Sequence, residues 1–181
     1  VLTAAGVTGI AVALPAPTIA FAENPRDDAT DDVASLLDNI VGRVAGTNET
    51  NASAAVQRKL TDLYERAKEN LEDLIAEPST ELFPGMSLGT DEDNLSTTFK
   101  KLYEIAVATA MPVPSGASVP ADLSGNPKAK QHVISGLRWV YDHHFEDQES
   151  GYYGNWFNWE IANPTHISQT LALLRDDLEA S

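Results

Sequence analysis

The chain has 181 residues, 43% of them hydrophobic, and a formal net charge of −15 at pH 7. The length suits one domain or part of a larger one, and this hydrophobic content excludes a chain that is disordered throughout. The charge argues against nucleic-acid binding, which needs clustered Lys and Arg, and the absence of cysteine excludes disulfides and thiolate metal sites. The twelve Lys and Arg are scattered, so no basic cleft is predicted for an acidic ligand.

The first 22 residues carry no charge and end in Ala-Phe-Ala, the small-x-small pattern of a secretory cleavage site. Pro15 and Pro17 interrupt this apolar run, so we expect no stable membrane insertion. A buried N-terminal helix is the alternative interpretation. We predict a signal peptide over 1–22, an exported domain over 23–181 and a clipped start, because the chain begins with Val and lacks a basic n-region.

Hydrophobic residues at three- and four-residue spacing predict five amphipathic helices. The predicted apolar stripes cover 33–44, 56–74, 95–110, 127–144 and 163–174. Acidic sequence before the first helix suits a helix N-terminus, and Asn51 is the predicted N-cap of the second. Asn126-Pro127 and Asn163-Pro164 each predict a capping side chain followed by proline at the first helical position. No segment alternates with a period of two, so we expect no strands.

Two proline-rich linkers, 76–91 and 112–126, are long for a compact helical bundle. They favour an array of helical hairpins over a tight four-helix bundle. The chain ends at Ser181, soon after the fifth helix shows its apolar face, so we expect truncation at this end too.

Residues 151–164 hold five aromatic side chains between Tyr152 and Trp159, interrupted by Asn155 and Asn158. Aromatic rings stack on the apolar faces of sugar rings, and nearby amides can bind the hydroxyls. The alternative is that these rings fill the core between the fourth and fifth helices. We expect both, with some rings directed inward and others outward.

Other candidate sites in the sequence are weaker. His143 and His144 are adjacent on a helix and point about 100° apart, so they do not form a metal site by simple geometry, and we predict no metal. Paired carboxylates could hydrolyse glycosides, although a solvated acidic face is the favoured interpretation. The acidic run comprises Asp142, Glu146, Asp147 and Glu149. Glu160 is expected to be buried among the aromatics, accepting hydrogen bonds from loop or helix-end N–H groups.

The sequence GNWFNWEIANPTHISQTLALL, residues 154–174, resembles the N-terminal helical domain of the family 8 polysaccharide lyases, which include hyaluronate, chondroitin AC and xanthan lyases. Phe157 stands where many members carry Trp, and Ala162 replaces the usual Gly. Over about 30–150 the resemblance is limited to the helical layout. It implies an all-α fold in which helical hairpins form the N-terminal part of an incomplete α/α toroid.

The resemblance also implies a function. The family's substrate-binding aromatic patch maps onto Trp156 and Phe157, with Asn155 beside it. The implied protein is a secreted, monomeric lyase that needs no cofactor. The implied reaction is β-elimination on a uronic-acid-containing polysaccharide, with hyaluronan as the first candidate and chondroitin as another. The family's catalytic residues lie downstream of this motif, so we assign none and expect this chain alone to be inactive. The alternatives are a non-catalytic helical sugar-binding module and a helical interaction domain whose aromatics are all in the core.

Overall fold

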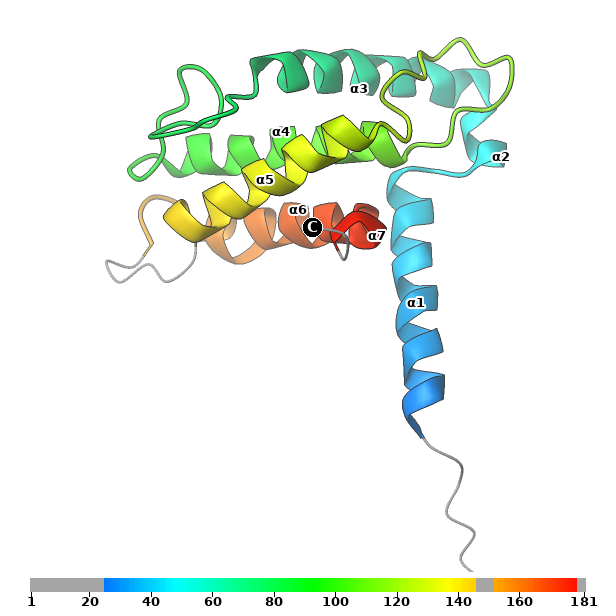
Figure 1. The fold of residues 1–181 in the computed structure, drawn as a ribbon, viewed down its shortest axis with the longest axis horizontal. Helices are drawn as coiled ribbons and strands as arrows, with labels where there is room; N and C mark the ends of the chain where they lie inside the picture. The colour runs from blue at the N-terminus through cyan, green and yellow to red at the C-terminus, as the bar shows by residue number, and fades with distance from the viewer. Residues whose placement is uncertain (1–24, 146–151, 179–181) are drawn as a thin grey trace, which may run out of the picture.

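The computed structural model of the chain describes residues 25–145 and 152–178 (Figure 1). In chain order its elements are α1 (Pro25–Val44), α2 (Asn48–Asn51), α3 (Ala54–Asp73), α4 (Glu92–Ala110), α5 (Pro127–His144), the π-helical turn η1 (Asn158–Ala162), α6 (Asn163–Leu173) and α7 (Arg175–Leu178). Within these ranges there are helices and no strand, which confirms the predicted all-α class. The predicted signal peptide over 1–22 lies outside the described residues.

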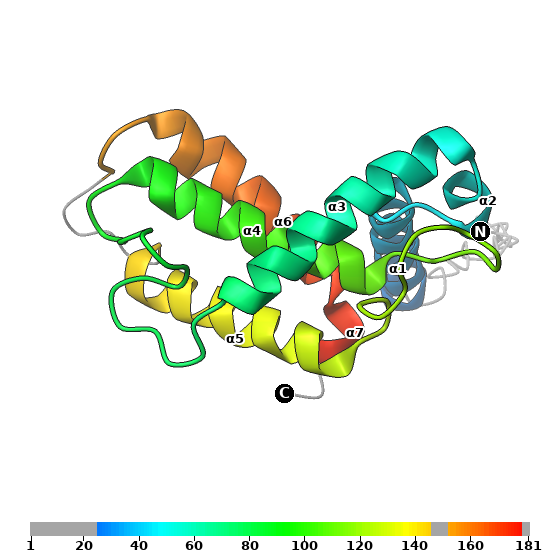
Figure 2. The same cartoon turned by 90° about the horizontal axis from the view of Figure 1, so that it is seen from above.

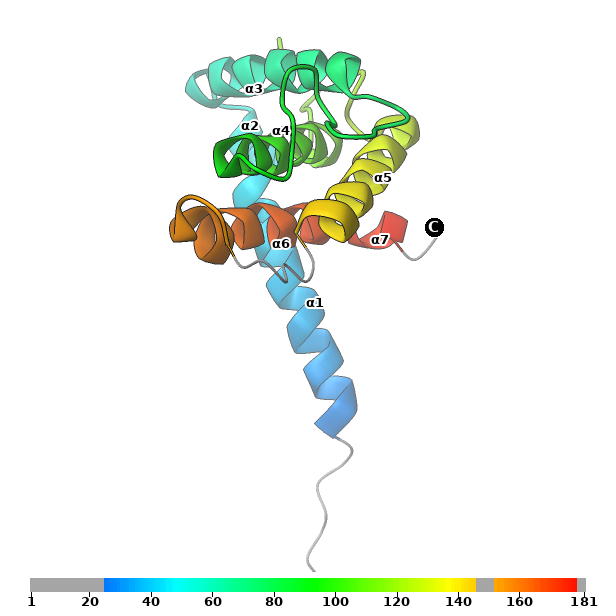
Figure 3. The same ribbon diagram turned by 90° about the vertical axis from the view of Figure 1, so that its left-hand side faces the viewer.

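Helix α4 is the centre of the fold. It packs against α3, α5 and α6, and Figure 3 shows it between α3 and α6 with α5 to one side. Successive helices from α3 to α6 run in alternating directions, and α3 crosses over α4 in Figure 2. The α4 side chains of Leu95, Phe99, Leu102 and Ile105 are each at most 1% exposed. Burying a side chain of this kind contributes about 1.5–3 kcal/mol, so α4 is the main apolar spine.

Helix α1 stands apart from this layer of helices (Figure 1). Among the α1 side chains that the structure describes, Val41 and Val44 near its C-terminal end pack on the core, whereas Val33 and Leu36 are 56% and 60% exposed. The helix also begins earlier than predicted, so the acidic residues expected before it lie within its first turns.

The two long linkers have packing roles of their own. In the segment between α3 and α4, Ile75 N–H donates to the Leu82 carbonyl at 3.0 Å, and Leu82 and Phe83 are buried in the core. Gly136 of α5 faces Leu82, where an added Cβ would lie only 3.1 Å from its side chain. In the segment before α5, the Tyr64 hydroxyl of α3 hydrogen-bonds to Asp122. Both linkers therefore contribute residues that pack on or hydrogen-bond to the helices.

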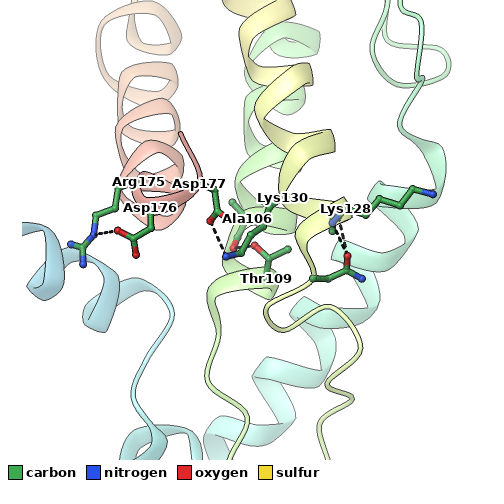
Figure 4. A network of polar contacts seen from close by, with 9 residues as sticks. Ala106, Thr109, Lys128, Lys130, Arg175, Asp176 and Asp177 are labelled. Atoms are coloured by element: carbon green, nitrogen blue, oxygen red, sulfur yellow. Dashed lines mark hydrogen bonds and ion pairs between the residues drawn. The ribbon is translucent and has the colours of Figure 1, made fainter. Parts of the chain in front are cut away.

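The short helix α7 is attached to its neighbours by charged pairs. Lys130 Nζ of α5 lies 2.8 Å from Asp177 Oδ2, and Arg175 of α7 pairs with Asp176 beside it, as Figure 4 shows. Arg175 also reaches Asp38 of α1 at 2.5 Å. Exposed pairs contribute about 0–1 kcal/mol each, so these contacts orient α7 more than they stabilise the fold.

Two of the three predicted N-caps are wrong. Asn126 does cap α5, accepting from the N–H groups of Lys128 and Ala129 at 3.1 Å each. Asn51 instead ends α2, is 1% exposed, and donates to the carbonyls of Ala45 and Pro112. The N-cap position of α3 is Ser53.

Asn163 does not start a helix either, because helical backbone already precedes it. Its N–H donates to the Asn158 carbonyl, five residues back, which is the π-helical pattern. The next residue, Pro164, has no N–H, and its ring crowds the carbonyl four residues earlier, that of Glu160. Pro164 therefore explains a π-bulge inside the helix rather than its beginning.

Among the described residues, no helix combines the length and apolar composition that a membrane span requires.

Candidate functional site

The aromatic segment divides into a buried part and an exposed part, as predicted. Trp159 is 2% exposed, whereas Trp156 is 62% and Phe157 47% exposed. Tyr152 is exposed as well, at 56%. This division excludes the interpretation in which all the aromatics belong to the core.

Trp159 attaches the segment to the core. Its ring is stacked between those of Tyr152 and Phe145, with centroid distances of 5.0 and 5.6 Å and interplanar angles of 6°. Tyr153 meets it edge-on at 5.0 Å, and the indole N–H donates to the Tyr153 carbonyl at 2.8 Å. Such pairs contribute about 0.5–1.5 kcal/mol each beyond their burial, so Trp159 holds the loop firmly.

Trp156 and Phe157 form what we call the aromatic platform. Their rings lie edge to face, with centroids 6.2 Å apart and an interplanar angle of 79°. They follow a loop that Trp159 anchors and precede the π-helical turn, so their backbone is fixed on both sides. Two adjacent, exposed rings on fixed backbone can cover the apolar face of a flat ligand.

Asn155 supports the platform directly. Its side-chain Oδ1 accepts from the Phe157 N–H at 3.0 Å, which caps the helical turn that begins at Trp156. The residue is exposed, and its amide nitrogen has no hydrogen-bond partner among the described residues. That N–H₂ group is available to a ligand oxygen beside the platform.

Two carboxylates of α4 accept from the loop. Glu92 Oε1 accepts from the Asn155 backbone N–H at 2.9 Å, and Asp93 Oδ1 accepts from Asn158 Nδ2 at 3.3 Å. Sequence reasoning missed both acids because their partners are more than sixty residues away and no local spacing marks them.

The prediction that Glu160 is buried is wrong. Glu160 is exposed and accepts a hydrogen bond from the Tyr152 hydroxyl, which raises the pKa of that tyrosine. The reason is helical geometry: Trp159 points inward, and its neighbour in the same turn points about 100° away. Among the residues whose burial the structure describes, the buried carboxylate is Glu104 of α4, 9% exposed, which accepts from Arg66 Nε at 3.3 Å and Asn70 Nδ2 at 3.1 Å.

The basic residues are less scattered in space than in sequence. Packing of α3 on α4 brings Arg66, Lys100 and Lys101 to the rim of one groove of about 250 Å³, together with Glu69 and Glu104. The neighbourhood of the aromatic platform is acidic instead. Glu92 and Asp93 hydrogen-bond to residues that flank the two rings, and Glu160 follows Phe157 by three residues in the sequence. A ligand placed at the platform would therefore meet rings and hydrogen-bonding groups rather than basic side chains.

His143 and His144, at the C-terminal end of α5, pack on Trp139. The ring of His143 is stacked on Trp139 at 5.3 Å and that of His144 meets it edge-on at 5.1 Å. Burial, and secondarily His143, lowers the pKa of His144. No group of three or more His, Asp or Glu in the described part of the chain is arranged to hold a metal. Three residues of the predicted acidic run lie outside the described part of the chain: Glu146, Asp147 and Glu149.

Comparison with known proteins identifies the domain. Residues 38–181 match the model of the polysaccharide lyase family 8 N-terminal alpha-helical domain. The chain therefore belongs to polysaccharide lyase family 8. A curated relative, the xanthan lyase of Bacillus sp. (strain GL1), is 23% identical over 166 residues, which cover 91% of this chain and 16% of the relative.

Solved structures show the same fold. A Paenibacillus xanthan lyase matches with a TM-score of 0.69 and 24% identity, covering 81% of this chain and 14% of its own. The Streptomyces coelicolor A3 chondroitin AC lyase, solved in complex with chondroitin sulphate, matches with a TM-score of 0.65 and 24% identity. The match covers 83% of this chain and 19% of the lyase chain. Both agree with the predicted helical hairpins of an incomplete α/α toroid. The chain spans less than a fifth of the length of these relatives.

Proposed function

We propose that this chain is the helical N-terminal part, over 23–181, of a secreted lyase that cleaves a uronic-acid-containing polysaccharide by β-elimination. In this proposal Trp156 and Phe157 seat the polymer, and Asn155 donates to it. The observation that supports the proposal is that two adjacent aromatic rings are exposed while Trp159, two residues further along the same segment, is buried. Exposed Trp and Phe side chains are costly to leave in water, and their placement suits a ligand with an apolar face.

The reaction needs more than this platform. β-Elimination removes the proton from the carbon beside the uronate carboxylate, forms a carbon–carbon double bond and expels the 4-linked oxygen. It requires a group that neutralises the carboxylate, a base close to the proton and an acid for the leaving oxygen. We assign none of these roles to this chain, which we expect to bind polymer and to be inactive alone. Hyaluronan is the first substrate to test; the names of the relatives add chondroitin and xanthan.

The test uses the full-length gene product with hyaluronan, chondroitin and xanthan. Cleavage should create unsaturated ends that absorb in the ultraviolet. Trp156→Ala should raise KM about tenfold, since a stacked aromatic anchor contributes on the order of 1–2 kcal/mol. The matched control is Tyr141→Ala, another partly exposed aromatic, 38% exposed on α5, which should leave KM unchanged.

The second candidate is a helical sugar-binding domain without chemistry. It is favoured by the same platform, which needs no catalytic group to hold a sugar ring. Polymer binding that depends on Trp156, with no unsaturated product from any of the three polymers, would support this candidate and end the lyase proposal.

A further inference from the structure

We propose that Glu92, in the first turn of α4, is the positioning residue of the aromatic platform, and that Gly154 is required because the Glu92 carboxylate occupies the space of a side chain there. The proposal rests on the proposed role of Trp156 and Phe157 in polymer binding. It concerns the contacts that fix the backbone from which the two rings project.

Two hydrogen bonds in series lead from Glu92 to the platform. Glu92 Oε1 accepts from the Asn155 N–H at 2.9 Å, and Asn155 Oδ1 accepts from the Phe157 N–H at 3.0 Å. Trp156 lies between these two residues in the chain. Glu92 therefore fixes the backbone from which both rings project, and it does so from a separate helix.

Gly154 gives independent evidence for the same contact. Its φ is +72°, and a Cβ added there would overlap the carboxyl group of Glu92. At Gly85, Gly116 and Gly125, which also have positive φ, an added Cβ meets nothing within 4 Å. The backbone conformation favours glycine at all these positions, but only at Gly154, among these four, would an added Cβ also have to displace the Glu92 carboxylate.

The support for Glu92 is itself rigid. Asp91 caps α4, its Oδ1 accepting from the N–H groups of Asp93 and Asn94 at 3.0 and 3.2 Å. Asp93 adds a second link to the segment through Asn158. Acidic side chains are favoured at a helix N-terminus, so this turn can present its carboxylates at little electrostatic cost.

Without Glu92, the outer side of the loop loses its acceptor while the Trp159 anchor on the inner side remains. The chain would stay folded, but the platform would have to be ordered by the ligand, which weakens binding. A small misplacement of a binding group can reduce catalytic efficiency by up to about 10²-fold. We expect a tenfold higher KM, about the same as for loss of the ring itself, and an unchanged kcat at saturating polymer.

The experiment measures KM, kcat and thermal unfolding for four variants of the full-length protein. Glu92→Ala should raise KM, and Gly154→Ala should do the same because its Cβ displaces the carboxylate. Glu92→Gln keeps an oxygen acceptor and should restore the wild-type KM. Glu65→Ala is the matched control, since Glu65 is an exposed glutamate on α3 with no hydrogen bond or ion pair within the described ranges.

The combination with Trp156→Ala separates the two proposals. If Glu92 acts through the ring, Glu92→Ala should add little to the KM of Trp156→Ala, because coupled residues are not additive. Additive effects, failure of Glu92→Gln to restore KM, or a wild-type KM for Glu92→Ala would overturn the role of Glu92. If Trp156→Ala itself leaves KM unchanged, the proposed platform fails instead. Should Glu92→Ala not fold, Glu92→Asp, whose carboxylate is one methylene too short, decides by the same criteria.

Discussion

Trp159 donates its indole N–H to the carbonyl oxygen of Tyr153 at 2.8 Å, and only 2% of Trp159 remains exposed. Three residues earlier, Trp156 is 62% exposed. The same short sequence thus holds one tryptophan that belongs to the fold and one that belongs to the surface. The two should respond to mutation in different ways.

Trp159→Ala should lower the free energy of unfolding by about 3–5 kcal/mol, because it removes a large buried ring and leaves a cavity between Tyr152 and Phe145. Trp156→Ala should change it by no more than about 0.5 kcal/mol, as is usual for an exposed side chain. Urea unfolding followed by circular dichroism measures both. Equal losses for the two variants would contradict the division of the segment into anchor and platform.

Asn51→Ala should cost about 1–3 kcal/mol, since it leaves the carbonyls of Ala45 and Pro112 without their buried donor. Asn51→Asp should cost at least as much, because it places carboxylate oxygens against the two backbone carbonyl oxygens, with no hydrogen to share between them. Chemical unfolding of both variants checks this. The control is Asn48→Ala, at the other end of the same short helix but exposed, which should be nearly neutral. A neutral Asn51→Ala would contradict the role of Asn51 as a buried donor to these two carbonyls.

The helix pattern was predictable because apolar spacing is a local signal. All five predicted stripes correspond to helices, and Asn126-Pro127 marks the start of α5 correctly. The identical dipeptide at Asn163-Pro164 misled, because helical turns already precede it and bury Trp159. A cap signal is reliable only where the preceding residues are not themselves helical.

The site was predictable in part for the same reason. Rare aromatic residues in order identified the segment, and the polar interruptions indicated that its rings face two ways. The anchoring by Glu92 was not predictable, since its partner Asn155 is brought to it by the packing of α4 against η1 and α6. The prediction for Glu160 is wrong because proximity to Trp159 in the sequence does not place the carboxylate on the same buried side of the helical turn.

Two partly buried histidines should make stability depend on pH. Burial, and secondarily His143, lowers the pKa of His144; burial, then Lys100, lowers that of His166, against an opposing effect of Glu104. The folded state therefore binds fewer protons than the unfolded state between these lowered pKa values and the ordinary value of about 6.5. Stability should be full above pH 6.5 and should fall as the pH drops below it.

Urea midpoints at pH 7.5, 6.5 and 5.5 measure this dependence. Lower pH also reduces the self-repulsion of a chain with a net charge of −15, an opposite effect that both proteins in a comparison share. The double variant His144→Gln/His166→Gln lacks the two titrating histidines and retains only this shared effect, so its urea midpoint should fall less as the pH drops than that of the wild type. Parallel pH curves would show that neither histidine contributes.

Asn163 places a polar side chain in the core, and replacing it tests whether that buried amide costs stability. It is 0% exposed, and neither its Oδ1 nor its Nδ2 has a hydrogen-bond partner in the part of the chain that the structure describes. A buried amide without partners costs about 1–3 kcal/mol, and leucine has a similar size and a better helix propensity. Asn163→Leu should therefore raise the free energy of unfolding by about 1–2 kcal/mol.

Asn70→Leu is the matched control, because Asn70 is also a buried helical asparagine, 7% exposed, but donates to Glu104 Oε2 at 3.1 Å. Removing that donor should cost about 1–3 kcal/mol, so the two Asn→Leu changes should have opposite signs in the same unfolding assay. Because both replace the same side chain in a buried helix, differences in helix propensity and size cancel. A loss of stability for Asn163→Leu equal to that of Asn70→Leu would mean that the Asn163 amide is hydrogen-bonded in solution, with a buried water as its partner.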